Sequence, residues 1–279
     1  MIYDVAYSAP GQTHGLTGVT AVDRARPIHR TLPEEVPVAM VFNGTTQAVM
    51  MATPADIADF AYGFALGEGV VTAPGEIESF ETVPHADGIE ARMWLHTDRA
   101  DALAARRRVM AGPVGCGLCG IDSLEQANRD VPHVPDSPMR LARAEVNGAT
   151  EALRAHQPLH DQTRATHAAG FLMPGQGIVA AREDVGRHNA LDKLIGALAR
   201  QGIDPASGAV VMTSRLSVEL VQKSAMAGCP VMIAVSAPTA YALKLADNAG
   251  ITIAAFARGG RFDVYSHPHR INDEVSDVA

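Results

Sequence analysis

The second half of the chain alternates short apolar runs with segments of ordinary helical length, and this alternation restricts the folds available to it. The strand-like runs are residues 177–181, 209–212, 231–235 and 251–256. The helical segments between them are residues 189–200, 216–227 and 241–249. Units of this kind form crossovers, which place successive strands parallel in one sheet. The pattern therefore predicts an α/β domain with a mainly parallel sheet.

The first half of the chain has a different pattern. Residues 36–44 are apolar and end in Asn-Gly, and residues 47–51 resume the apolar run, which predicts a β-hairpin. Thr53-Pro54 then begins a helix with apolar residues at helical spacing. Short strands follow, and a helix over 102–109 leads to a cysteine pair. We expect an N-terminal α+β domain over 1–122, a proline-rich linker over 123–138 and the α/β domain over 139–279.

Composition excludes several classes of protein. The chain has 279 residues, is 47% hydrophobic and carries a formal net charge of -8, which disfavours nucleic-acid binding because phosphate neutralisation needs a basic face. No stretch approaches the roughly 20 apolar residues that cross a bilayer, and the first residues lack the regions of a secretion signal. We expect a cytoplasmic protein without membrane insertion, whose cysteines stay reduced.

Two of the three cysteines lie in residues 115–120, Gly-Cys-Gly-Leu-Cys-Gly. Flanking glycines allow the backbone to turn tightly, which leaves both thiols accessible. Such a pair can carry sulfur, exchange electrons or bind a metal. The residue types alone leave these chemistries open.

Four other interpretations compete with sulfur transfer. A zinc deaminase needs a His-x-Glu element and an adjacent Pro-Cys-x-x-Cys, and a structural zinc site needs two further paired ligands; both sets are incomplete here. A dithiol oxidoreductase is the stronger alternative, although its Cys-x-x-Cys normally begins a helix after a strand. A non-enzymatic chaperone of a cofactor would not need Cys116.

Polar side chains follow each predicted strand of the second half. Residues 182–189 are dense in charge, and ion pairing with helix capping competes there with a ligand role. Ser214 and Arg215 are expected at a helix N-terminus, where free N–H groups favour an anion. Arg258 and Arg261 surround a Gly-Gly turn. Because ligands bind beyond the carboxyl ends of parallel strands, the set predicts a phosphate-bearing ligand.

These segments together resemble one family. The segments that carry the resemblance are residues 115–120, 167–169, 182–193 and 214–223, with support from 42–44 and 63–69. They are similar to the formate dehydrogenase accessory sulfurtransferase family, FdhD, over about residues 35–269. The cysteine pair and the long acidic-basic motif match without departure.

The resemblance implies a sulfurtransferase that accepts a persulfide from a cysteine desulfurase. It passes the sulfur to the bis-molybdopterin guanine dinucleotide cofactor of formate dehydrogenase. Cys116 would hold the persulfide and Cys119 would assist the relay.

The resemblance also implies a fold and a binding site. The C-terminal domain would be a three-layer, cytidine deaminase-like domain, and the protein a homodimer that binds GDP as a fragment of the cofactor. The cofactor-binding residues would be Phe256, Ala257, Arg258, Gly259, Gly260 and Arg261, together with Ser214, Arg215 and His167.

Two further residues have structural interpretations. Cys229 precedes an apolar strand and is expected in the core. His188 lies four residues before Asp192 on a predicted helix and is expected to pair with it.

Overall fold

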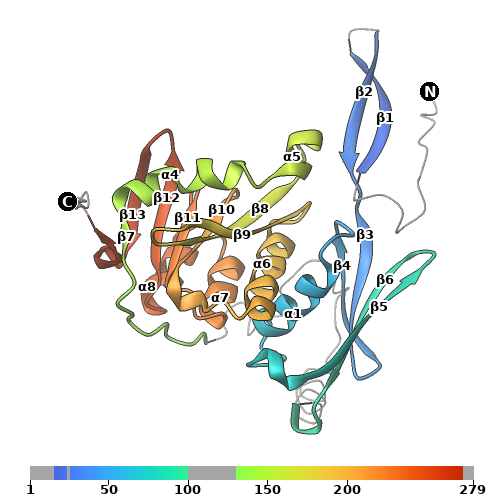
Figure 1. Cartoon of the computed structure of the whole chain (residues 1–279), viewed down its shortest axis with the longest axis horizontal. Helices are drawn as coiled ribbons and strands as arrows, with labels where there is room; N and C mark the ends of the chain where they lie inside the picture. Colours follow the sequence, from blue (N-terminus) through green and yellow to red (C-terminus); the bar gives the residue numbers. More distant parts are fainter. Residues whose placement is uncertain (1–15, 24–25, 100–129, 273–279) are drawn as a thin grey trace.

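The structure is a computed structural model that describes residues 16–23, 26–99 and 130–272. Cys116, Cys119 and the predicted helix over 102–109 lie outside the described residues. Within the described ranges, two larger sheets lie on either side of a pair of crossing helices (Figure 1).

The N-terminal half contains the predicted hairpin and helix. An antiparallel ribbon of β1 (Leu16–Asp23) and β2 (Arg26–Pro33) projects from a four-stranded sheet (Figure 1). That sheet has the order β4-β3-β6-β5, with β3 (Val36–Phe42), β4 (Thr45–Ala52), β5 (Ile77–His85) and β6 (Gly88–Leu95). Helix α1 (Ile57–Gly67) packs on it through its apolar face, and a short 3-10 turn, Pro74–Glu76, precedes β5.

The C-terminal half forms a six-stranded sheet of order β13-β12-β11-β10-β8-β9. The strands are β8 (His167–Met173), β9 (Gly177–Asp184), β10 (Ala209–Met212), β11 (Val231–Ala234), β12 (Thr252–Arg258) and β13 (Arg261–Ser266). The pairings β10–β11 and β11–β12 are parallel, as expected, but β8 pairs antiparallel with both neighbours and β13 pairs antiparallel with β12. The sheet is therefore mixed, and the prediction of a mainly parallel sheet was wrong. The tight turns that join β8 to β9 and β12 to β13 can connect only antiparallel strands.

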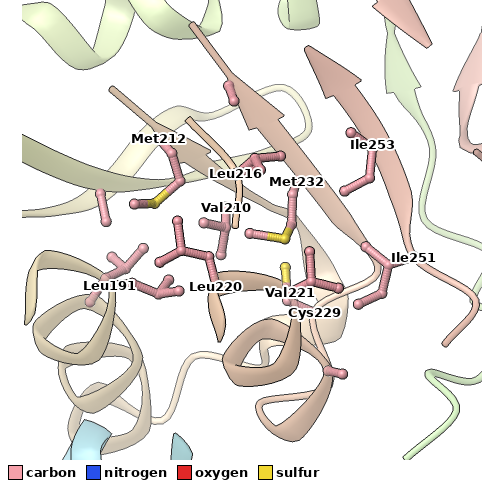
Figure 2. Packing of buried hydrophobic residues seen from close by; sticks show 14 of the residues in the cluster. Leu191, Val210, Met212, Leu216, Leu220, Val221, Cys229, Met232, Ile251 and Ile253 are labelled. Carbon is pink, nitrogen blue, oxygen red and sulfur yellow. The ribbon is translucent and has the colours of Figure 1, made fainter. Parts of the chain in front are cut away.

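Helices cover both faces of this sheet. On one face lie α6 (Arg187–Gln201), α7 (Val218–Met226) and α8 (Ala240–Asn248), and on the other lies α4 (Arg143–Arg154), followed by α5 (Pro158–Thr163) (Figure 1). Alternate residues of β10 belong to the two cores: Val210 and Met212 to the α6–α8 side, Val211 to the α4 side. Figure 2 shows the first of these cores, with Cys229 in it. Three layers result, as expected.

The described part of the predicted linker packs against the C-terminal half. Val134 is buried and its N–H donates to the Ala249 carbonyl at 2.8 Å. Asp136 forms an ion pair at 3.4 Å with Arg270, which is almost fully buried. A short strand, β7 (Leu141–Ala142), then pairs in parallel with β14 (Ile271–Asn272). Short 3-10 turns occupy Pro205–Ser207 and Pro268–Arg270.

Candidate functional site

The sheet places the predicted binding residues along one edge. The carboxyl ends of β10, β11 and β12 lie there, and because β8 is antiparallel, its first residue lies at the same edge. Thr213 Oγ1 accepts the N–H of Ala168 at 2.8 Å, which aligns the residue after β10 with the start of β8. The N–H of Phe256 points to the Ser236 carbonyl at 3.5 Å. The structure therefore brings the start of β8 and the exits of β10, β11 and β12 to one edge.

The loop after β10 differs from the prediction. Helix α7 begins at Val218, so Ser214 and Arg215 do not lie at a helix N-terminus, and that prediction was wrong. Leu216 instead forms a bridge with Pro238, and its N–H donates to the Ala237 carbonyl, which keeps the backbone extended. The hydroxyl of Ser214 is buried and donates to the Arg215 carbonyl at 2.9 Å, while the Arg215 side chain is exposed.

His167, the first residue of β8, is half-buried at this edge. Burial lowers its pKa below the ordinary value of 6.5, and the nearby Arg187 and His160 act in the same direction. The imidazole is therefore neutral at pH 7 and can accept a hydrogen bond as well as donate one.

Strand β12 contains, close to its end, a conformation that is uncommon for its residue type. Phe256 has a φ of 54° and a side chain that is 37% exposed, and the strand register shifts between Ala255 and Arg258. A bulky residue in the left-handed region costs on the order of 1 kcal/mol or more, and such strain is concentrated at functional sites. Ala257 is buried, and its carbonyl accepts the Thr150 hydroxyl at 2.7 Å, which fixes the segment from behind.

Arg258 and Arg261 are direct cross-strand partners, and both are exposed. Like charges at opposed positions of a ribbon destabilise it. Gly259 and Gly260 between them both have positive φ, as a tight hairpin requires. An exposed pair of opposed guanidinium groups is relieved by an anion, because each group supplies several donors suited to phosphate or carboxylate.

A second polar group at the edge was not predicted from the sequence. His188 Nε2 lies 3.3 Å from Ser217 Oγ and 3.7 Å from Glu219 Oε2, so it faces the start of α7. The expected pairing of His188 with Asp192 is wrong, because Asp192 is turned toward Lys223. Burial lowers the His188 pKa from 6.5 to about 4, with Arg187 adding to the effect. In the sequence, only Ser217 and Glu219 at the start of α7 could have indicated that His188 has polar partners there.

The charged motif over 182–193 connects the two halves of the chain. Lys193 and Asp184 are both fully buried and lie 2.6 Å apart. Lys193 Nζ also donates to the Thr53 carbonyl at 2.9 Å, and Asp184 accepts the N–H groups of Thr53 and Gly186. Ion pairing within the motif, one of its two interpretations, is confirmed, and the backbone of Thr53 from the N-terminal half adds a hydrogen bond to each member of the pair.

Arg182 and Glu183 of the motif also form charged contacts with other elements. Arg182 donates to Asp59 of α1 at 2.6–2.7 Å, and Arg200 pairs with the same carboxylate. Glu183 accepts the N–H groups of Leu159 and His160 at 2.8 Å, which fixes the start of α5. The motif therefore organises the junction between the two halves.

The crossing of α1 and α6 has backbone-to-backbone contact. A Cβ added to Gly63 would lie 1.7 Å from the Asp192 carbonyl oxygen, and one added to Gly196 would lie 1.8 Å from that of Asp59. Only glycine permits this approach. The close crossing and the buried ion pairs hold the four-stranded sheet in a defined position against the six-stranded one.

The remaining described features give no metal site or membrane span. Cys229 is fully buried, as expected, and burial raises its pKa to about 11. Among the residues that the structure describes, no group of three or more His, Cys, Asp or Glu side chains is arranged to hold a metal ion. No helix in the described part of the chain is both long and apolar enough to cross a membrane.

Comparison with known proteins agrees with these observations. A family model described as the FdhD/NarQ family matches residues 33–272. A protein named "Sulfur carrier protein FdhD" from Agrobacterium fabrum is 52% identical over 242 residues, which is 87% of this chain and 89% of that protein. A protein of the same name from Bordetella bronchiseptica is 50% identical over 238 residues, 85% of this chain and 86% of the relative.

A solved structure has the same fold. It is the crystal structure of a protein assigned as a formate dehydrogenase accessory protein from Desulfotalea psychrophila, with a TM-score of 0.70 and 23% identity, and the match covers 92% of this chain and 98% of that one. The family match, the curated relatives and the expected motifs lead to one conclusion. The chain belongs to the FdhD/NarQ family.

Proposed function

We propose that this protein is a sulfurtransferase that carries sulfur on Cys116 from a cysteine desulfurase to the bis-molybdopterin guanine dinucleotide cofactor of formate dehydrogenase. The names of its relatives, sulfur carrier proteins, support the carrier role. The glycine-framed cysteine pair supplies the chemistry. We place the protein in the cytoplasm, as a homodimer.

Loading is a thiol–persulfide exchange. The Cys116 thiolate attacks the terminal sulfur of the donor's cysteine persulfide, the donor S–S bond breaks, and the donor cysteine leaves as a thiolate. A new S–S bond forms on Cys116. The terminal sulfur moves without net oxidation or reduction, so this step needs no other reactant.

Delivery releases the sulfur as sulfide. The Cys119 thiolate attacks the Cys116 sulfur atom, which forms a Cys116–Cys119 disulfide and expels the terminal sulfur with both bonding electrons as a metal ligand. The cysteine pair is thereby oxidised by two electrons. A cellular thiol must reduce the disulfide before the next cycle.

The observation that carries the binding assignment is the opposed Arg258 and Arg261 pair beside the strained Phe256. The diphosphate groups of the dinucleotide would supply an anion between these two guanidinium groups. The exposed aromatic ring of Phe256 offers a face on which a guanine can stack. His167, Ser214 and Arg215 lie at the same edge, where they would contact the rest of the cofactor.

Two experiments test the proposal. Intact mass after incubation with a cysteine desulfurase and cysteine should show one added sulfur on the Cys116 peptide, and Cys116→Ala should lose both this sulfur and activation of formate dehydrogenase. Activation by Cys116→Ala at the normal rate would instead support a cofactor chaperone.

Calorimetry with GDP tests whether the nucleotide part of the cofactor binds at this edge of the sheet. Loss of one charge-assisted contact is worth on the order of 1.5–3 kcal/mol, so Arg258→Ala and Arg261→Ala should each weaken GDP binding by roughly tenfold to a hundredfold. Arg164→Ala is the matched control, since this exposed arginine lies at the end of α5. Unchanged affinity in both edge variants would move the pocket elsewhere.

A further inference from the structure

One buried ammonium group links the two halves of the chain to the candidate edge. Lys223 of α7 is 5% exposed, and its Nζ lies 2.7 Å from Glu68 Oε1 and 3.0 Å from Asp192 Oδ2. Glu68 directly follows α1, while Asp192 lies on α6. The three side chains therefore connect three helices, one of them from the N-terminal half.

The same helix face reaches the edge. Glu219 lies one turn before Lys223 on α7, so both residues project from the same side of the helix. Glu219 contacts His188, whose pKa is affected by the charges of both Lys223 and Glu68. The loop over 213–217, which holds Ser214, leads straight into this helix. Glu68 is therefore connected to the loop through Lys223 and α7.

Lys223 and Asp192 are almost fully buried and the Glu68 side chain is 34% exposed, so charge is a costly way to fill this site. Breaking or desolvating a buried ion pair costs several kcal/mol, and well-packed apolar residues often give equal or greater stability. The α1–α6 crossing already brings the two halves into contact through Gly63 and Gly196. The Glu68–Lys223 contact adds a defined orientation of the two halves relative to each other, because charged hydrogen bonds fix orientation more strictly than apolar packing does.

We propose that Glu68 and Lys223 are positioning residues for sulfur delivery: through α7 and the loop over 213–217, they align the N-terminal half with the carboxyl edge of the six-stranded sheet. This proposal rests on the proposed function, in which the cysteine pair carries the sulfur. The pair follows the N-terminal half in the sequence, so the alignment of that half bears on delivery. The two residues serve the transfer from the loaded protein to the bound cofactor. Loading by the donor does not depend on them.

The test uses full-length Glu68→Gln, which leaves the Lys223–Asp192 pair in place so that the protein still folds. Glu78→Gln is the matched control, because Glu78 is an exposed residue of β5. Each protein is loaded with sulfur by a cysteine desulfurase, and the added mass is measured. Two rates are then compared per loaded molecule: sulfide release to dithiothreitol, and activation of formate dehydrogenase that lacks the sulfur ligand.

We expect Glu68→Gln to load fully and to release sulfide to dithiothreitol at the wild-type rate, since a small thiol needs no alignment. Activation of the dehydrogenase should fall about tenfold, as for the loss of one charge-assisted contact. Glu68→Asp, which keeps the charge on a shorter side chain, should recover part of the rate. Lys223→Met should show the same split in its folded fraction.

Other results overturn the proposal. Wild-type activation by Glu68→Gln would show that the contact is dispensable, and an equal fall in both rates, or no recovery in Glu68→Asp, would assign it to folding or cysteine reactivity. If the wild-type protein itself takes up no sulfur, the proposed function fails instead, so the two failures are distinguishable.

Discussion

Replacement of Lys193 by Met should destabilise the protein strongly, although the substitution keeps most of the side-chain volume. Lys193 and Asp184 are both fully buried at 2.6 Å, and Lys193 also donates to the Thr53 carbonyl. Methionine would leave the Asp184 carboxylate buried with neutral donors only, from Thr53, Gly186 and Asn189. Removing one partner of a buried ion pair typically costs about 3–5 kcal/mol.

The assay is urea unfolding together with thermal unfolding of the full-length protein. A loss of about 3–5 kcal/mol corresponds to a fall in Tm of roughly 6–20 °C for a chain of this size. Lys244→Met is the matched control, because Lys244 is an exposed residue of helix α8, and we expect it to change stability by less than about 0.5 kcal/mol.

The double variant Lys193→Met with Asp184→Asn separates the energy of the ion pair from the contributions of the surrounding residues. It removes both charges, so it should be less destabilised than the sum of the single variants. A loss of under about 1 kcal/mol in Lys193→Met, or strict additivity in the double variant, would refute the interpretation that this pair holds the two halves together.

Three further predictions follow from burial and close contact. Gly196→Ala should lower the unfolding free energy by about 1–3 kcal/mol or more, because its Cβ would clash with the Asp59 carbonyl, whereas Gly148→Ala on α4, with no neighbour within 4 Å, should be neutral or stabilising; urea titration compares them. The folded-state pKa of His188 is lowered, so the stability it contributes is present above pH 6.5 and is lost as the pH falls toward about 4. His188→Gln should therefore flatten the pH dependence of the urea midpoint in that window, and an unchanged profile would contradict the assignment. Iodoacetamide at about pH 8 should modify Cys229 only after unfolding, because this thiol is fully buried with its pKa raised to about 11; mass spectrometry of the native protein would contradict this if the Cys229 peptide were labelled.

Local patterns in the sequence predicted the individual elements well. The Asn-Gly turn, the helix after Thr53-Pro54 and the strands of the central parallel trio all follow from apolar periodicity and turn chemistry, which depend on neighbouring residues alone. The Gly-Gly turn between Arg258 and Arg261 closes a hairpin. Family membership was also readable from the motifs, and the comparisons confirm it.

Contacts between distant residues were decided only by the tertiary structure. Nothing in the local sequence indicates that β8 lies beside β10, or that Leu216 forms a bridge with Pro238 and so delays the start of α7. The motif over 182–193 also finds its partners more than 100 residues away, in Thr53 and Asp59.

The cause is the same in each case. Sequence periodicity states which side of an element is apolar, but it does not state which element covers that side or which charge pairs with which. At the α1–α6 crossing, two glycines permit backbone contact and buried carboxylates then find their cations. The sequence by itself determined the strands, the helices and the family of this protein. The packing of its two halves decided that the charged motif over 182–193, whose residue types also suit a ligand site, forms the junction between them.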